Sequence, residues 1–152
     1  MAEEVRNIVL HQNGFSRTVL NSDNEITMSF LQHVRGDALF FSRHHPVEHG
    51  TYLRDDGMLC MEYNGVTTPI VSKEEIRIPG LHNVENYLTA FAATWGDVSV
   101  ETMAEVANTF GGVEHRIELV RELNGAKWYN DSIASSPSRT IAGLDSFDQK
   151  II

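Results

Sequence analysis

The chain has 152 residues, of which 41% are hydrophobic and 22% are charged, which is enough for one ordinary domain or for two small or partial ones. Its 12 Lys and Arg residues against 21 Asp and Glu residues give a net charge of −9, and no basic cluster offsets it, which argues against a nucleic-acid partner. A single cysteine excludes an intrachain disulfide, and the absence of a signal peptide or a membrane-length apolar segment favours a cytoplasmic protein with no membrane partner.

The first 42 residues predict helices that alternate with short strands. Apolar residues at helical spacing indicate a helix over 3–12 and another over 22–34, for which Ser22 or Asp23 is a suitable N-cap. Each of these helices is followed by a run of strand-forming residues. The two strands are expected at 17–21 and 37–42.

Residues 51–78 predict an antiparallel meander, because tight turns at 55–57 and 64–65 separate short strand-like runs. Pro69 lies inside the third run, so that strand is either an edge strand or irregular there. Cys60 alternates with polar and apolar neighbours and reads as a small buried group. The four strands are expected at 51–54, 58–63, 66–71 and 75–78.

Two helices and a flexible join follow the meander. The first has an apolar face through Tyr87 and Phe91, and Asn83 is well placed as its N-cap. The second begins at the cap Ser99 and stops before Gly111-Gly112. We place a domain boundary at these glycines, so that residues 1–111 and 112–152 form two partial domains.

The remaining residues predict a hairpin, a helix from Pro137 to about Phe147, and a third strand at 150–152 that is cut off by the chain's end. The hairpin strands at 116–122 and 126–130 are joined by an Asn-Gly turn. The second strand ends on Asp131, a position at which open α/β sheets place groups that touch ligands. The alternative is that Asp131 or Ser132 caps the following helix.

Three segments together resemble the Mur ligases of peptidoglycan synthesis. They are TVLNSDNE at 18–25, LHNVENYLTAFAA at 81–93 and GGVEHRIELVRELNGAKWYNDSIASSPSRTIAGLDSF at 111–147. The spacing of HN-x-x-N, HR-x-E and N-D-S is specific in combination, and the resemblance is strongest over 79–152. Within the family it is nearest to the ligases that add D-glutamate to UDP-N-acetylmuramoyl-L-alanine.

The resemblance implies an α/β fold made of two incomplete parts. Residues 1–111 would be the latter part of the central ATP-binding domain, a mixed sheet with a small antiparallel meander and helices. Residues 112–152 would be the truncated start of the Rossmann-like C-terminal domain, which binds the amino acid. The P-loop pattern G-x-x-x-x-G-K-[ST] is absent, and the family's metal ligands and modified lysine would precede residue 1, so we expect a fragment that is inactive on its own.

For the complete enzyme the resemblance implies an ADP-forming acid–amino-acid ligase of cell wall biogenesis, and hence of cell shape and division. ATP and Mg²⁺ would be its cofactors, and UDP-N-acetylmuramoyl-L-alanine and D-glutamate its substrates. ATP phosphorylates the carboxylate in this family, and the amine then attacks the acyl phosphate.

The same resemblance assigns roles to five residues. Asn86 would contact adenine, and Asn83 would bind the nucleotide unless it only caps its helix. Arg116 would reach the phosphates and act catalytically, unless it is a solvated surface residue. Asp131 would accept hydrogen bonds from the ribose. Ser135 would offer a hydroxyl to the substrate, or would serve at the helix entry.

Two positions depart from the family pattern. A lysine is expected two residues after the aspartate, where this chain has Ile133, and Thr-Asn is expected where it has Ser135-Ser136. Another ligase of the superfamily, such as a different Mur ligase or a folylpolyglutamate synthase, is therefore an alternative. A non-catalytic nucleotide-binding module without a P-loop is a second alternative, and the reading frame before Met1 would distinguish it.

A metal site is not predicted. The segment RHHPVEHG at 43–50 gathers three histidines, but Pro46 interrupts any helix that would align His45 with His49, and the spacing matches no zinc motif. A solvated loop is the simpler interpretation.

Overall fold

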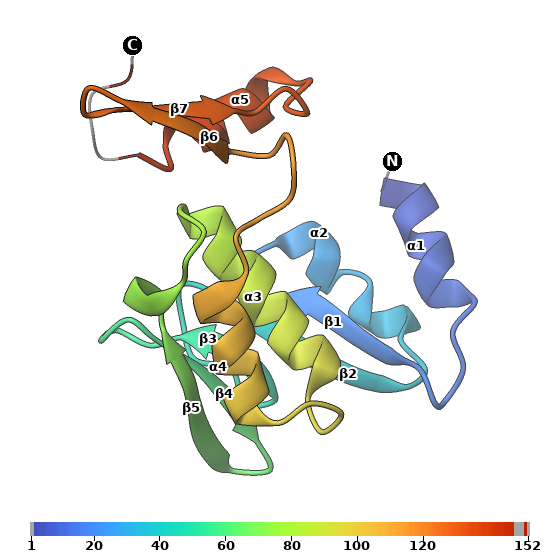
Figure 1. Cartoon of the computed structure of the whole chain (residues 1–152). Helices are drawn as coiled ribbons and strands as arrows, with labels where there is room; N and C mark the ends of the chain where they lie inside the picture. Colours follow the sequence, from blue (N-terminus) through green and yellow to red (C-terminus); the bar gives the residue numbers. More distant parts are fainter. Residues whose placement is uncertain (1, 148–150, 152) are drawn as a thin grey trace.

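A computed structural model describes residues 2–147 and Ile151, which form a five-stranded sheet and a separate two-stranded sheet (Figure 1). The strands of the larger sheet, in spatial order, are β1 (Arg17–Asn21), β2 (Asp37–Ser42), β3 (Gly50–Leu53), β4 (Met58–Tyr63) and β5 (Val66–Ser72). The smaller sheet pairs β6 (Glu118–Leu123) with β7 (Ala126–Asn130). The α-helices are α1 (Ala2–Leu10), α2 (Glu25–Met28), α3 (Leu81–Thr94), α4 (Val100–Thr109) and α5 (Pro137–Leu144), and short 3₁₀ turns lie at Leu31–His33 and Lys73–Glu75.

The larger sheet is mixed, which confirms the predicted fold class. β1, β2 and β3 run parallel, whereas β3, β4 and β5 form the predicted antiparallel meander. β5 lies at the edge of the sheet, and the register shifts between Leu59 and Cys60, where Pro69 faces Cys60. Both expectations for Pro69 are therefore met, since a residue without an N–H is tolerated at an edge and at an irregularity.

One face of the larger sheet packs against α3 and α4 and contains the core. On β4 the alternating side chains Leu59 and Met61 join this core, together with Leu88 and Phe91 of α3. Burying such a side chain stabilises the fold by about 1.5–3 kcal/mol. The hydroxyl of buried Thr51 donates to the Leu88 carbonyl at 2.7 Å, so the sheet and α3 are also joined by a buried hydrogen bond.

The opposite face of the sheet has a smaller apolar cluster. Cys60 packs there with Val47 and Tyr52, and its side chain is fully buried, as its position in the strand predicts. Burial raises the pKa of the Cys60 thiol. None of the helices in the described part of the chain is long and apolar enough to cross a membrane.

The structure corrects two predicted elements and leaves a third untested. The helix expected over 22–34 is only four residues long, because Asn24 caps it and Ser29 ends it. The strand expected at 75–78 is wrong, since a 3₁₀ turn with a capping box from Ser72 to Glu75 occupies its start. Of the strand expected at 150–152, only Ile151 is among the described residues, so that prediction stays untested.

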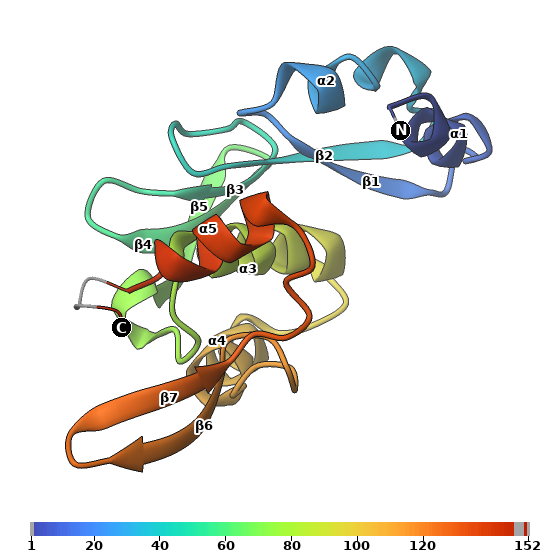
Figure 2. The same cartoon turned by 90° about the horizontal axis from the view of Figure 1, so that it is seen from above.

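The hairpin and α5 form a unit that lies beside the N-terminal end of α3 (Figures 1 and 2). A single extended segment joins it to α4 and carries Gly112, whose φ is 97°. Small groups make the contact to α3: a Cβ added at Gly80 would lie 2.5 Å from the Ser146 hydroxyl oxygen. Gly80 has a φ of 101°, so glycine satisfies both the backbone and the close approach here.

Candidate functional site at the junction of α3 and the C-terminal unit

Motif residues at the start of the C-terminal unit hold one another through hydrogen bonds. The Glu118 carboxylate accepts from the His115 backbone N–H at 2.9 Å and from the Asn130 amide nitrogen at 3.4 Å. The same Asn130 nitrogen lies 2.8 Å from Nδ1 of the His115 ring. Glu118 begins β6 and Asn130 ends β7, so these bonds fix the incoming linker to the base of the hairpin.

Arg116 lies between two residues with a left-handed backbone. The φ of His115 is 65° and that of Ile117 is 47°. A positive φ is costly for a β-branched residue, so surrounding contacts must hold Ile117 in place. Asp131 supplies one of them, because its Oδ1 accepts a hydrogen bond from the Ile117 N–H at 3.2 Å. The Arg116 side chain itself is exposed.

Asp131 is held against α5 rather than at the start of that helix. A Cβ added at Gly143, a buried residue of α5, would lie 2.9 Å from Oδ2 of Asp131. The N-cap of α5 is Ser136, which makes no capping bond through its side chain. The alternative that Asp131 or Ser132 caps this helix is therefore wrong.

Arg116 and Asp131 line a pocket of about 250 Å³, which we call the junction pocket. Its walls come from the first turn of α3, the linker, the turn after β7, and α5. The residues that matter for its chemistry are His82, Arg116, Asp131, Ile133 and Arg139. The pocket thus brings together His82, which precedes Gly111-Gly112 in the chain, and side chains that follow these glycines.

His82 is the residue through which α3 takes part in the pocket. Its Nδ1 lies 3.5 Å from the Ser146 hydroxyl oxygen. Burial and the neighbouring Arg116 guanidinium lower the pKa of His82, against the opposite effects of Glu85 and Asp131. The imidazole is therefore neutral near neutral pH. Sequence reasoning missed His82, although it directly precedes Asn83 in the HN-x-x-N motif.

Asn83 lies within α3, which begins at Leu81, so the prediction that it is the N-cap is wrong. Its buried side chain donates through Nδ2 to the Pro79 carbonyl at 2.5 Å and accepts from Nδ2 of Asn86 at 3.2 Å. Asn86 is exposed one turn further along the helix and forms no other side-chain hydrogen bond among the described residues. Asn83 therefore orients Asn86, which keeps its carbonyl oxygen and one N–H for an outside partner.

Ser135 lies in the turn between β7 and α5 and is exposed. Its hydroxyl forms no hydrogen bond within the part of the chain that the structure describes, so the predicted substrate contact stays a prediction. Ile133, where the family pattern has a lysine, is 53% exposed and lines the junction pocket.

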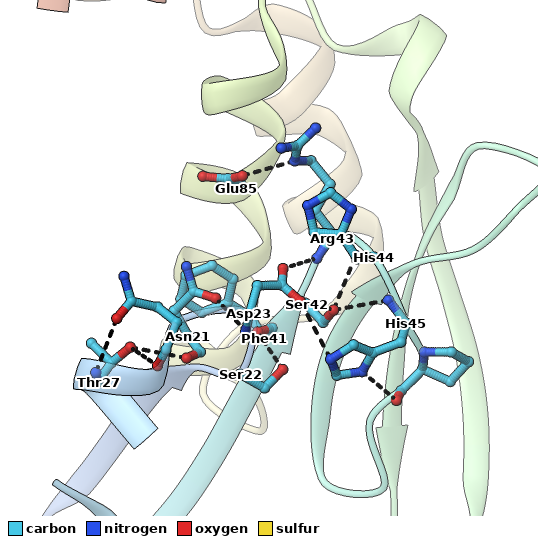
Figure 3. Close-up of polar contacts among 12 residues, drawn as sticks. Asn21, Ser22, Asp23, Thr27, Phe41, Ser42, Arg43, His44, His45 and Glu85 are labelled. Carbon is cyan, nitrogen blue, oxygen red and sulfur yellow. Dashed lines mark hydrogen bonds and ion pairs between the residues drawn. The ribbon is translucent and has the colours of Figure 1, made fainter. Parts of the chain in front are cut away.

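A second polar cluster lies where the parallel strands β1 and β2 end (Figure 3). Asp23 accepts hydrogen bonds from the Ser42 hydroxyl at 2.6 Å and from the Arg43 N–H at 2.8 Å. Its Oδ1 also lies 3.4 Å from Nε2 of His45. Arg43 in turn contacts α3, since its Nε lies 2.8 Å from a carboxylate oxygen of Glu85. We call these five residues the carboxyl-edge cluster.

Two of the three histidines of segment 43–50 contact protein groups through their side chains. His45 lies beside Asp23 and the Pro46 carbonyl, and His49 stacks on Tyr63 and lies 3.3 Å from Asp37. Among the residues that the structure describes, no three His, Cys, Asp or Glu side chains gather as the ligands of a metal would.

No family model matches the chain. It is, however, 52% identical over 147 residues to the UDP-N-acetylmuramoylalanine--D-glutamate ligase of Acetivibrio thermocellus and 50% identical to that of Ruminiclostridium cellulolyticum. The chain belongs to the Mur ligase family. Each alignment covers 97% of this chain and 31% of the relative, so the chain spans about a third of the length of the Mur ligases it matches.

Solved Mur ligase structures share the fold. The chain superposes with a TM-score of 0.72 on the UDP-N-acetylmuramoylalanyl-D-glutamyl-2,6-diaminopimelate--D-alanyl-D-alanyl ligase of Acinetobacter baumannii, at 13% identity, over 95% of this chain and 32% of the other. The murein peptide ligase of Psychrobacter arcticus gives a TM-score of 0.68 at 22% identity, over 95% of this chain and 31% of that one. The resemblance seen in the motifs is thereby confirmed at the level of fold and family.

Proposed function

We propose that this chain is the nucleotide-facing part of an ATP-dependent ligase that adds D-glutamate to UDP-N-acetylmuramoyl-L-alanine in the cytoplasm. The observation that carries the proposal is the junction pocket. Arg116 and Asp131 of the C-terminal unit face His82 of α3 there, and the neighbouring α3 face presents Asn86. The names of the relatives that are about half identical supply the substrates.

The proposed roles follow from the side-chain chemistry. The amide of Asn86, oriented by Asn83, offers the donor and acceptor that an adenine edge needs. Asp131 keeps lone pairs beyond the bond to Ile117 and would accept from a ribose hydroxyl. Arg116 would place its guanidinium at the phosphates, where positive charge stabilises the transferring group. Ser135 would meet the acceptor substrate from the turn before α5.

The pocket residues fit the ribose and phosphate portion of a nucleotide, since cationic groups and a carboxylate acceptor line the same space. ATP, with Mg²⁺ on its phosphates, would supply the phosphoryl group that activates the carboxyl group before the amine of D-glutamate replaces it. The role of the described residues would be to bind the nucleotide and to orient it. We place the domain boundary at Gly111-Gly112. The junction pocket would then lie between the two partial domains, and a nucleotide bound there would contact both.

A chimera tests the proposal. The matching segment of the Acetivibrio thermocellus ligase is replaced by this chain, and phosphate release is measured with UDP-N-acetylmuramoyl-L-alanine, ATP and D-glutamate. We expect activity that depends on D-glutamate. Asn86→Ala should raise the KM for ATP about tenfold and leave the KM for D-glutamate unchanged, because one polar contact to the nucleotide is lost. Asn108→Ala, at an exposed position of α4, is the matched control.

A folded chimera without activity would contradict the proposal. Activity with another amino acid, but not with D-glutamate, would favour a different ligase of the superfamily. Micromolar ADP binding by the 152-residue chain alone, lost in Asn86→Ala, would favour a self-sufficient nucleotide-binding module. Under our proposal the isolated chain binds ADP no more tightly than about the millimolar range.

A further inference from the structure

Arg139 lines the junction pocket from the first turn of α5, opposite the linker that carries Arg116. Its backbone N–H donates to the carbonyl of the N-cap residue Ser136 at 3.1 Å, so the side chain projects from the first turn of the helix. We propose that Arg139 binds an anionic oxygen group of the ligand that enters this pocket. The group is either a phosphate of the nucleotide or a carboxylate of the amino acid, and only the naming of these two sources rests on the proposed function.

The charges of the pocket support an anionic ligand. Two guanidinium groups, Arg116 and Arg139, line it against the single carboxylate of Asp131. One oxygen of that carboxylate already accepts the Ile117 N–H, and the His82 imidazole is neutral because its pKa is lowered. The pocket therefore carries an excess of positive charge in a chain whose net charge is −9.

A comparison of the ion pairs of the arginines also supports an anionic ligand. Arg17, Arg43 and Arg54 each pair with a carboxylate. Within the side chains that the structure describes, residues 6–147 and Ile151, Arg139 forms neither an ion pair nor a hydrogen bond through its guanidinium. A guanidinium stays charged at any physiological pH and has five N–H donors in a planar fork. These donors match the paired oxygens of a phosphate or a carboxylate.

Arg139 also supplies charge that its neighbour in the pocket does not. Ile133 lines the same space and has no polar group. A lysine at position 133 would bring an ammonium group into the pocket from the turn after β7. If the role of Arg139 is to provide positive charge there, such a lysine should replace it.

NMR titration of the 152-residue chain tests the proposal without requiring ligase activity. Inorganic pyrophosphate and D-glutamate are added in separate titrations, and the amide signals of the pocket residues are followed. We expect saturable shifts with at least one of them, at about millimolar concentration. Arg139→Gln should weaken that binding about tenfold, because a charge-assisted hydrogen bond is lost.

Arg139→Lys should retain most of the affinity, and Ile133→Lys should restore it in the Arg139→Gln background. Arg121→Gln removes another exposed arginine, on β6 outside the pocket, and should change nothing. Unchanged titrations in Arg139→Gln, or no saturable shift with either anion, would overturn the proposal. Failure of Ile133→Lys to restore binding would also contradict it.

The chimera then separates the two sources. A rise in the KM for ATP in Arg139→Gln assigns the contact to a phosphate, and a rise in the KM for D-glutamate assigns it to the carboxylate. An inactive chimera whose isolated chain still shows Arg139-dependent binding would contradict the proposed function and leave the anion site standing. An active chimera that is indifferent to Arg139→Gln in both KM values would contradict the anion site alone.

Discussion

The carboxyl-edge cluster and the junction pocket are both rich in charged side chains, but they differ in how those charges are matched. In the carboxyl-edge cluster Asp23 is satisfied by Ser42, Arg43 and His45, and Arg43 is paired with Glu85. In the junction pocket neither arginine has an ion-pair partner among the described side chains.

The difference separates two uses of polar residues. A carboxylate whose hydrogen bonds are all made inside the protein contributes to stability, and its loss leaves donors without partners. A charged group that lacks partners contributes little to stability and is available to a ligand. Changes in the junction pocket should therefore affect activity and binding, whereas changes in the carboxyl-edge cluster should affect unfolding.

The largest effect is expected for Arg116→Ala in the chimeric ligase. The turnover number should fall by a factor on the order of 10², or about 2.7 kcal/mol, because a positive charge at the transferring phosphate acts mainly in the transition state. The unfolding free energy should change by less than about 0.5 kcal/mol, since the side chain is exposed. Steady-state kinetics and urea unfolding measure the two quantities. An unchanged turnover number would make Arg116 a surface residue.

Asp23→Ala should affect unfolding rather than activity. The substitution leaves the Ser42 hydroxyl and the Arg43 N–H without their acceptor, and the unfolding free energy of the chain should fall by about 2 kcal/mol. Urea unfolding with a constant slope measures the change. Asp23→Asn, which keeps one acceptor oxygen, should lose less. A loss below about 0.5 kcal/mol would show that the cluster is not the stabilising region we infer.

The Arg43–Glu85 pair should contribute less to the unfolding free energy than Asp23 does. A double-mutant cycle of Arg43→Gln and Glu85→Gln should give a coupling of about 0.5–1 kcal/mol that decreases with added salt, because both side chains are only half-buried. The Arg54–Asp56 pair is the control, since both of its side chains are more exposed and belong to one turn. A coupling no larger than that of the control would reduce Arg43–Glu85 to an ordinary surface pair.

The smallest effect is expected in the titration of His82. Because burial and the Arg116 guanidinium both lower the pKa of His82, Arg116→Gln should raise that pKa. The lowered pKa of His82 also determines the direction in which stability changes with pH. The unfolded chain takes up the proton more readily, so His82 lowers the unfolding free energy as the pH falls below its ordinary value of 6.5. NMR titration of the His82 ring checks both statements, and an unchanged pKa would mean that Arg116 does not face His82 in solution.

Much of the fold could be predicted because local signals were strong. The Asn64-Gly65 and Asn124-Gly125 turns fixed two hairpins, and Ser99 does cap α4, accepting from the Thr102 N–H at 3.2 Å. The errors arose where two local signals competed. Ser22, Asp23 and Asn24 are all good N-caps, but Ser22 donates to the Phe41 carbonyl and Asp23 accepts from Ser42 and Arg43, which leaves Asn24 to cap α2.

The candidate site was predictable in part for the same reason. The motifs named Arg116 and Asp131, and the structure places both in one pocket. Arg139 had no such signal, because an arginine early in a helix is ordinary in sequence. His82 belongs to the HN-x-x-N motif, but the resemblance assigned it no role. Their significance depends on how the C-terminal unit lies against α3, which no local pattern in the sequence contains.

The left-handed conformation of Ile117 constrains how this segment can change in evolution. Asp131 helps to hold that conformation, and Glu118 and Asn130 hold the neighbouring His115, so the positions of the HR-x-E and N-D-S motifs cannot drift one at a time. A lineage that replaced Asp131 would be under pressure to relieve the backbone at position 117, most simply with glycine. In an alignment of close homologues, substitutions at 115, 117, 118, 130 and 131 should therefore occur together, while those on the outer face of the β6–β7 hairpin accumulate independently.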